Sequence, residues 1–290
     1  MGQATRGTGL VAAGIGWGIA AGMALGTLLI APAIDGSLGG ESVTASEAGQ
    51  GASEAESGEL ARANGRVDEA NTLLARHGDA IVSGVLDGVA VTMIRTASAS
   101  EEDAAGVRWM ANAAGAANSG GIRLTEKFFE RDAADELSSV IANTLPAGAT
   151  LSVDNLGPGT HAGESLAATL TTASDKDRAL VLEALTQAGF IEVNGEVGVA
   201  DVIVVVAADE FEGEGFTTQL VGDFAQGLAS NARTVVAAQG AAPALDGVGS
   251  QGNVDTEAGR VQAVLLLAEG PAEEAAEEAA EEPAEDAAEE

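Results

Sequence analysis

Short apolar runs and amphipathic stretches alternate along residues 85–269, and this alternation predicts the fold of that region. Apolar runs of roughly 4–8 residues are typical of strands buried in a parallel sheet, whereas apolar residues three and four apart are typical of helices. The predicted strands lie at residues 89–94, 122–124, 190–193, 201–206 and 234–238. The predicted helices lie at residues 100–115, 132–145, 165–172, 175–188, 216–229 and 255–268. This order indicates an α/β domain in which a largely parallel sheet is sandwiched between helices on both faces.

Several details of that domain follow from single residues. The run at 201–206 is the strongest strand signal and is expected at the centre of the sheet. Ser100, with Asp103 three residues later, is expected to cap the helix that follows it. Pro146 is expected to stop the helix before it, and residues 151–159 are predicted to form a loop.

Residues 9–31 form an uncharged apolar stretch, which predicts a single membrane-spanning helix. At ~1.5 Å per residue this helix is roughly 34 Å long, enough to cross a hydrocarbon core of ~30 Å. Arg6 precedes the stretch, and all the charged residues between the stretch and Arg62 are acids. The positive-inside rule therefore places residues 1–8 in the cytoplasm and the bulk of the chain outside the cell membrane. A signal peptide cleaved near Ala33 is the alternative, although signal sequences have shorter apolar regions of ~7–15 residues.

Glycines recur every four residues within that stretch. They are Gly14, Gly18, Gly22 and Gly26. Such a stripe of small residues lets two membrane helices approach closely, so it predicts self-association or docking of a membrane partner. The alternative is a glycine-rich anchor that only spans the bilayer.

Residues 32–58 are rich in Gly, Ser, Ala and Glu, which predicts a flexible linker, and a helical stem is predicted at 59–84. Apolar residues spaced by seven mark a seam along this stem. They are Leu60, Val67, Leu74 and Ile81. The seam favours a short parallel coiled coil, although an amphipathic helix packing on its own domain remains open. His77 lies on the same seam and is interpreted as a surface group rather than a metal ligand.

The formal net charge of −32 makes nucleic acid a poor partner, because like charges repel. Residues 270–290 contribute acids without any base and are predicted to form a disordered tail. The chain has no cysteine, so neither a disulfide framework nor a thiolate metal site is possible.

Ligands of parallel sheets bind at the carboxyl ends of the strands, which here are predicted at residues 96–100, 207–215 and 239–250. The middle loop carries four acids that could bind a divalent cation. They are Asp209, Glu210, Glu212 and Glu214. A solvated acidic loop at a helix start explains the same residues without a metal. The sequence has no phosphate-binding loop, nucleophile elbow or zinc-protease motif, so we expect neither an enzyme nor a bound cofactor.

The C-terminal segment at residues 252–261, followed by the apolar run at 264–267, resembles the signature of the actinobacterial MctB copper transport protein family. The overall layout is also similar to that family, and the resemblance covers residues 10–267. The signature residues are Asn253, Asp255, Thr256, Gly259 and Arg260. Asp255 is expected to cap the last helix, and Arg260 is expected to pair with Asp255 or Glu257 or to reach a loop carbonyl. Support of the fold is favoured over a partner site for this segment.

The resemblance implies a role in copper efflux at the cell envelope. It also implies an alternative, because corynebacterial members called SteB are associated with a cytoplasmic partner, SteA, in cell separation and envelope integrity. Such a scaffold would act with itself and with envelope or peptidoglycan machinery. Copper(I) prefers Cys and Met and copper(II) prefers His, and both kinds of ligand are scarce here. Met23 lies in the membrane stretch, whereas Met93 and Met110 lie in a strand and a helix, so the residues favour an oligomeric or indirect role.

Overall fold

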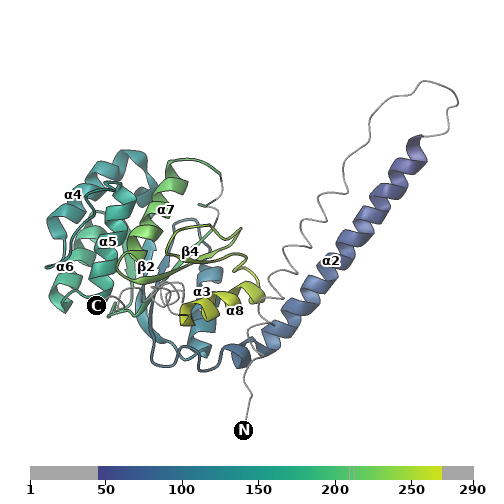
Figure 1. Ribbon diagram of the computed structural model, residues 1–290, viewed down its shortest axis with the longest axis horizontal. Helices are drawn as coiled ribbons and strands as arrows, with labels where there is room; N and C mark the ends of the chain where they lie inside the picture. Colours follow the sequence, from purple (N-terminus) through teal and green to yellow (C-terminus); the bar gives the residue numbers. More distant parts are fainter. Residues whose placement is uncertain (1–44, 209, 212, 270–290) are drawn as a thin grey trace, which may run out of the picture. The chain divides into compact units, whose positions relative to one another are not determined.

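The computed structural model describes residues 45–208, 210–211 and 213–269 (Figure 1). Two compact units divide the chain between Glu59 and Leu60, within helix α2 (Ala45–Val82). The predicted membrane helix at 9–31 with its glycine stripe, the segment at 1–8 and the tail at 270–290 lie outside the described residues. None of the helices in the described part of the chain is both long and apolar enough to cross a membrane.

Helix α2 begins earlier than the sequence predicts. The predicted linker at 32–58 is helical from Ala45 onward, and the predicted stem is the second half of the same helix. Alanine and glutamate are strong helix formers, and their propensity outweighs the roughly 1 kcal/mol cost of each interrupting glycine. Composition alone suggested a flexible chain because this segment lacks the apolar stripe of a packed helix.

The predicted seam of α2 is largely exposed to solvent in the single chain. Leu60 is 63% exposed, Val67 55% and Ile81 49%, while Leu74 is half-buried. The last turn of α2 instead packs on the domain through Gly78 and Val82. The coiled coil therefore stays a prediction.

The described residues form one six-stranded sheet with the order β3-β2-β1-β4-β5-β6. The strands are β1 (Ala90–Arg95), β2 (Ala117–Leu124), β3 (Ile191–Asn194), β4 (Val202–Ala207), β5 (Arg233–Ala238) and β6 (Gly249–Gln251). Neighbouring strands are parallel except β2 and β3, which pair antiparallel at one edge. The predicted α/β class is confirmed, and the sheet is mixed because of this edge strand. The topology changes direction between β1 and β4, which lie side by side at the centre.

Helices cover both faces of the sheet, as the sequence predicts (Figure 1). The helices of the domain are α3 (Glu101–Ala113), α4 (Ala134–Thr144), α5 (Pro158–Thr171), α6 (Asp175–Gln187), α7 (Phe216–Ala229) and α8 (Glu257–Ala268). Two 3-10 turns, Glu126–Phe129 and Arg131–Ala133, follow β2. Helices α4 to α7 contribute to the core on one face, and α3, α8 and the end of α2 contribute to the core on the other.

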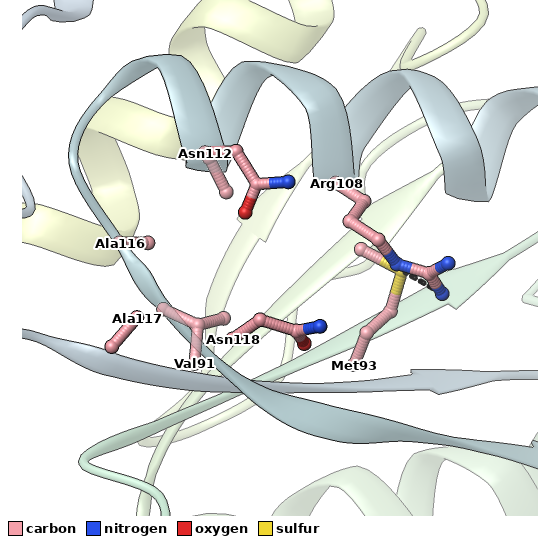
Figure 2. A pocket seen from close by; sticks show the side chains of 8 residues that line it. Val91, Met93, Arg108, Asn112, Ala116, Ala117 and Asn118 are labelled. Carbon is pink, nitrogen blue, oxygen red and sulfur yellow. Dashed lines mark hydrogen bonds between the residues drawn. The ribbon is translucent and has the colours of Figure 1, made fainter. Parts of the chain in front are cut away.

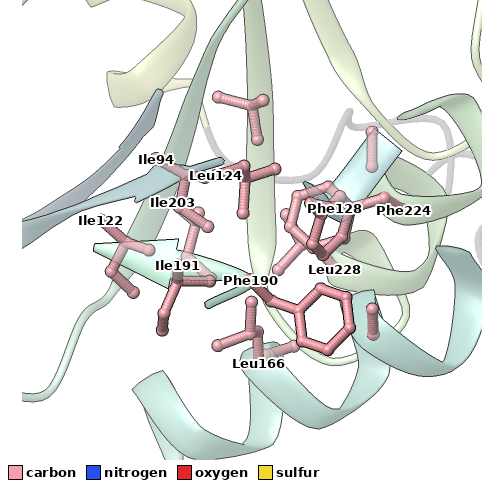
Figure 3. Packing of buried hydrophobic residues seen from close by; sticks show 14 of the residues in the cluster. Ile94, Ile122, Leu124, Phe128, Leu166, Phe190, Ile191, Ile203, Phe224 and Leu228 are labelled. Atoms are coloured by element: carbon pink, nitrogen blue, oxygen red, sulfur yellow. The ribbon is translucent and has the colours of Figure 1, made fainter. Parts of the chain in front are cut away.

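Strand β4 shows why the fold has two cores. All six of its residues are buried, and successive side chains point to opposite faces. Ile203 and Val205 join the core beneath α4 to α7, where Phe190 and Phe224 are fully buried (Figure 3). Val204, one position along, joins the core beneath α3 and α8. The prediction of a central strand at 201–206 is confirmed.

The predicted loop at 151–159 is confirmed for residues 151–157, whereas the predicted helix start near residue 165 is wrong, because α5 begins at Pro158. The helix begins at Pro158, because proline is favoured at the first helical position, where its missing N–H is not needed. Glycines then bring α5 against α7: a side chain on Gly163 would overlap the carbonyl oxygen of Phe224, and one on Gly227 would overlap that of Thr160. Polar sites lie at the start of α5, at the start of α8 and at the carboxyl ends of β1 and β4.

Candidate functional site

The carboxyl ends of β1 and β4 meet at the topological switch point, where sheets of this kind bind ligands. Glu210 occupies this place and is only 8% exposed. Its Oε2 accepts a hydrogen bond of 2.8 Å from the backbone N–H of Ala208, and its Oε1 accepts one from the hydroxyl of Ser98. The carboxylate is therefore engaged in joining the two loops.

The other predicted acids of this loop are not brought into a site by the described residues. Glu214 is exposed, and Asp209 and Glu212 lie outside the described residues. Within the part of the chain that the structure describes, no three His, Asp or Glu side chains gather as a metal site. The four-acid cation site stays a prediction.

A small cavity of about 10 Å³ lies between β1, β2 and α3, and Met93 is one of the residues that line it (Figure 2). Arg108 reaches down from α3 and places Nη2 3.7 Å from Met93 Sδ. Copper(I) sites need several soft ligands, and a guanidinium beside the sulfur opposes a second cation. The geometry therefore disfavours Met93 as a copper ligand.

A shallow groove of about 420 Å³ lies between α4 and α6. Its polar side chains mostly bond within their own helices: Ser139 donates to Asp135 O, and Thr144 donates to Val140 O. Polar groups of this groove do not converge on one point, as they do in ligand pockets that fix orientation.

The predicted signature residues are gathered at the start of α8. Thr256, and not Asp255, caps the helix: its Oγ1 accepts the N–H of Gly259 at 3.1 Å and donates to Asn253 O at 2.8 Å. The prediction of an Asp255 cap is wrong, because the chain turns one residue later than composition suggests. Asn253 adopts a left-handed conformation with φ of 55°, which asparagine tolerates better than most residues.

Arg260 is held by five groups, as the prediction of an acid or a carbonyl partner anticipates. Its Nε donates to Val254 O at 2.9 Å, and its Nη1 lies 3.0 Å from Glu257 Oε1. Its Nη2 lies 3.5 Å from the buried Asp103 Oδ1 and also contacts the carbonyl of Asp255. The fifth contact is steric, since a side chain on Gly106 of α3 would collide with the guanidinium.

Asp103 is itself fixed by Ser100, whose hydroxyl donates to Asp103 Oδ2 at 2.7 Å and accepts the Asp103 N–H at 2.9 Å. The predicted cap at Ser100 is confirmed. Because Arg260 bridges this cap to the start of α8, we call Asp103, Val254, Glu257 and Arg260 the Arg260 cradle. It ties two helices of one face together.

A second polar site, which the sequence did not predict, lies where α5 begins beside α7. It consists of Asn155, Thr160 and Asp223, and we call it the Asp223 cluster. A β-carbon on Gly157 would lie 3.2 Å from Asn155 Oδ1, 3.2 Å from Asp223 Oδ2 and 3.5 Å from Thr160 Oγ1, so these three oxygens gather beside Gly157. Burial raises the pKa of the Asp223 carboxyl above its ordinary value.

A signal for this site does exist in the sequence. Asp223 is a lone acid within the otherwise uncharged helix α7, and Asn155 precedes a Gly–Pro helix start. Neither signal indicates the other, because 68 residues separate them and only the α5–α7 contact brings them together.

Comparisons with known proteins agree with the resemblance. A family model described as "Copper transport outer membrane protein, MctB" matches residues 9–277. A Mycobacterium leprae protein named copper transporter MctB is 30% identical over 229 residues, which cover 68% of this chain and 70% of the relative. Proteins of the same name from Mycobacterium bovis and Mycobacterium tuberculosis are each 34% identical over 140 residues, which cover 44% of this chain and 45% of theirs.

Proposed function

The chain belongs to the MctB family, and from this premise we propose that it is a membrane-anchored envelope protein that serves copper efflux as a homo-oligomer. Family membership supports a copper-transport-related protein of the cell envelope, and its relatives are named as transporters. The finer proposal adds a single membrane helix at 9–31, a cytoplasmic N-terminus and an α/β domain outside the membrane.

The extent of the family match carries this proposal. The match begins at residue 9, where the apolar stretch starts, and continues through the whole α/β domain to residue 277. The match therefore covers the residues predicted to form the anchor and the stem as well as the α/β domain, which supports the proposal. The folded signature around Arg260 lies inside it.

The chemistry of the described residues favours an indirect or oligomeric role in copper transport. Met93 lines the small cavity between β1, β2 and α3, and its sulfur lies 3.7 Å from Arg108 Nη2. No three His, Asp or Glu side chains gather among the described residues, and the sulfur of Met93 lies beside Arg108, so we infer that copper is handled by an assembly of copies or by a partner. The exposed seam of α2 supports such association.

The test is a deletion strain grown on a copper series, with the full chain returned on a plasmid. We expect higher copper sensitivity in the deletion strain and recovery by the full chain. Unchanged copper tolerance would refute the copper role. Titration of the purified full chain with copper(I) and copper(II) then separates direct binding from an indirect role.

The oligomer has its own test. Replacing Gly18 and Gly22 by leucine should weaken cross-linking, because bulky side chains separate membrane helices at a small-residue stripe. Leu60→Gln with Val67→Gln removes the apolar seam of α2, and Leu180→Gln on α6 is the matched control because Leu180 is also exposed. Cross-linking that survives both changes would show that neither segment joins the copies.

A SteB-like scaffold acting with a cytoplasmic SteA-type partner in cell separation is the second candidate. The observation that favours the scaffold is the long exposed seam of α2, which suits a protein better than a metal ion. In the proposed topology this seam lies outside the membrane, so it would serve a second copy or envelope machinery, and the SteA-type partner would contact the cytoplasmic or membrane residues. Septum images of the same deletion strain test it, together with proteins captured by a tagged copy. Normal separation with no captured division protein would reject this candidate.

A further inference from the structure

Two side chains of the Asp223 cluster, Thr160 and Asp223, have no hydrogen-bond donor among the described residues. Thr160 is only 7% exposed, and its Oγ1 has no hydrogen-bond partner among the described residues. The Asp223 carboxylate likewise accepts no hydrogen bond and forms no ion pair within the described part of the chain, and burial alone sets the direction of its pKa shift. Buried polar atoms in native proteins nearly always have partners, so the buried Thr160 hydroxyl beside the half-buried Asp223 carboxylate calls for one.

The carboxylate does not serve the helix that it faces. The N-cap residue of α5 is Gly157, which has no side chain to cap the helix, and its N–H donates to Asn155 Oδ1 and not to Asp223. A carboxylate used as a cap would accept the first N–H groups of the helix. Asp223 therefore remains available to a group from outside.

The loop that carries Asn155 is fixed before any ligand arrives. The backbone N–H of Asn155 donates to Ser152 Oγ, and the N–H of Gly157 donates to Asn155 Oδ1 at 3.2 Å. Ser152 is held in turn by α5, since its N–H donates to Glu164 Oε2 at 2.8 Å and its carbonyl oxygen lies 3.0 Å from His161 Nε2. The oxygens of the cluster thus need little rearrangement to bind.

We propose that the Asp223 cluster binds a hard divalent cation, Ca²⁺ or Mg²⁺. Carboxylate, amide and hydroxyl oxygens are the ligands these ions prefer, whereas copper(I) prefers sulfur. The formal net charge of −32 draws cations toward the domain. A single carboxylate limits the affinity, so the dissociation constant is on the order of 10⁻⁴–10⁻³ M, as in extracellular calcium modules.

The proposal is independent of the copper role and is tested on the purified full chain after treatment with a chelator. Calcium chloride and magnesium chloride are titrated separately, by calorimetry and by thermal unfolding. We expect the melting temperature to rise by a few degrees at ~10 mM of the better ion, since a ligand of the native state stabilises it by mass action. The larger of the two shifts identifies the ion.

Three variants separate the site from general attraction to an acidic chain. Asp223→Asn should weaken binding at least tenfold, and Thr160→Val should weaken it several-fold. Gly157→Ala keeps every charge but places a methyl group among the three oxygens, and the φ of −61° at this position accepts alanine without strain. It too should abolish the shift in melting temperature.

Matched controls are Asp246→Asn, which removes an exposed acid from another loop, and Thr171→Val, whose hydroxyl bonds Ala167 O on the same helix. Both should bind like the wild-type chain. The proposal is overturned if neither ion shifts the melting temperature of the wild-type chain. It is also overturned if Asp223→Asn and Gly157→Ala keep the wild-type affinity, which would assign the bound ions to the acidic tail.

Discussion

The Arg260 cradle and the Asp223 cluster are both polar sites at helix starts of one domain, yet their bonding is opposite. In the cradle, Arg260 contacts two acids and two carbonyl oxygens, and Asp103 also accepts a hydrogen bond from the Ser100 hydroxyl. In the cluster, the oxygens of Thr160 and Asp223 lie close together without donors from the described residues. A satisfied buried network holds structure together, whereas an unsatisfied one costs stability until something binds it. We therefore expect the signature residues around Arg260 to support the fold, and the candidate ligand site lies elsewhere.

The largest expected effect belongs to Gly259→Ala in the signature. A β-carbon there would overlap the carbonyl group of Asn253, and Asn253 cannot retreat without losing its bonds to Thr256. We expect a loss of about 3 kcal/mol or more in the free energy of unfolding, measured by urea denaturation. Gly198→Ala is the control, because its added carbon meets nothing within 4 Å. Equal stability of the two variants would contradict the expectation that the signature residues support the fold.

Arg260→Met should have the next largest effect. It keeps much of the side-chain volume but removes the Arg260 donor from Asp103 Oδ1 and from the carbonyl of Val254. Because Arg260 and Asp103 are largely buried, we expect a loss of about 2–3 kcal/mol in urea denaturation. Arg123→Met is the comparison, since its acid partners are exposed and such pairs contribute ~0–1 kcal/mol. A loss as small as that of Arg123→Met would contradict the cradle.

The order of strands and helices could be predicted because most elements carry their own periodic pattern. Strand β4 is apolar throughout, and Ser100 followed by Asp103 three residues later predicts the capped start of α3. Strand β2 begins five residues earlier than its apolar pair at 122 and 124, because Ala117 to Gly121 bring only small and polar side chains to their pairing with β1. Backbone pairing of this kind leaves no hydrophobic signal.

The sites were less predictable because they join distant segments. Arg260 and Glu257 lie on one helix turn, so their pairing was within reach of sequence reasoning, whereas Asp103 lies 157 residues away. Glu210 was singled out as a cation ligand, but its bond to Ser98 depends on the adjacency of β1 and β4. The Asp223 cluster depends on close packing of α5 and α7, which no local pattern encodes.

Asn253→Ala should produce a moderate effect. The left-handed φ of 55° costs a residue with a β-carbon roughly 1 kcal/mol, and asparagine bears that conformation better than alanine. We expect a loss of ~1 kcal/mol for alanine and little or none for Asn253→Gly, because glycine adopts positive φ without strain. Denaturation curves of the two variants distinguish the conformational effect from a side-chain role. If glycine destabilises as much as alanine, the asparagine side chain itself would matter.

Asp223→Asn should have the smallest effect and the opposite sign. Because burial raises the pKa of Asp223 in the folded chain, the folded state keeps this proton at pH values where the unfolded chain has lost it. Stability should therefore fall as pH rises from the ordinary aspartate pKa through the raised one, and the variant should lack that fall. At neutral pH without divalent ions, Asp223→Asn should be as stable as the wild-type chain or slightly more so.

The sign of the stability change caused by Asp223→Asn distinguishes the Asp223 cluster from the Arg260 cradle. If Asp223→Asn lowers stability at neutral pH as Arg260→Met does, Asp223 has a stabilising partner and the cluster belongs to the fold. If the variant is neutral or stabilised, and Ca²⁺ or Mg²⁺ raises the melting temperature of the wild-type chain alone, the carboxylate is kept at a cost to the empty domain. A group that costs stability when empty and repays it on binding is the thermodynamic signature of a ligand site.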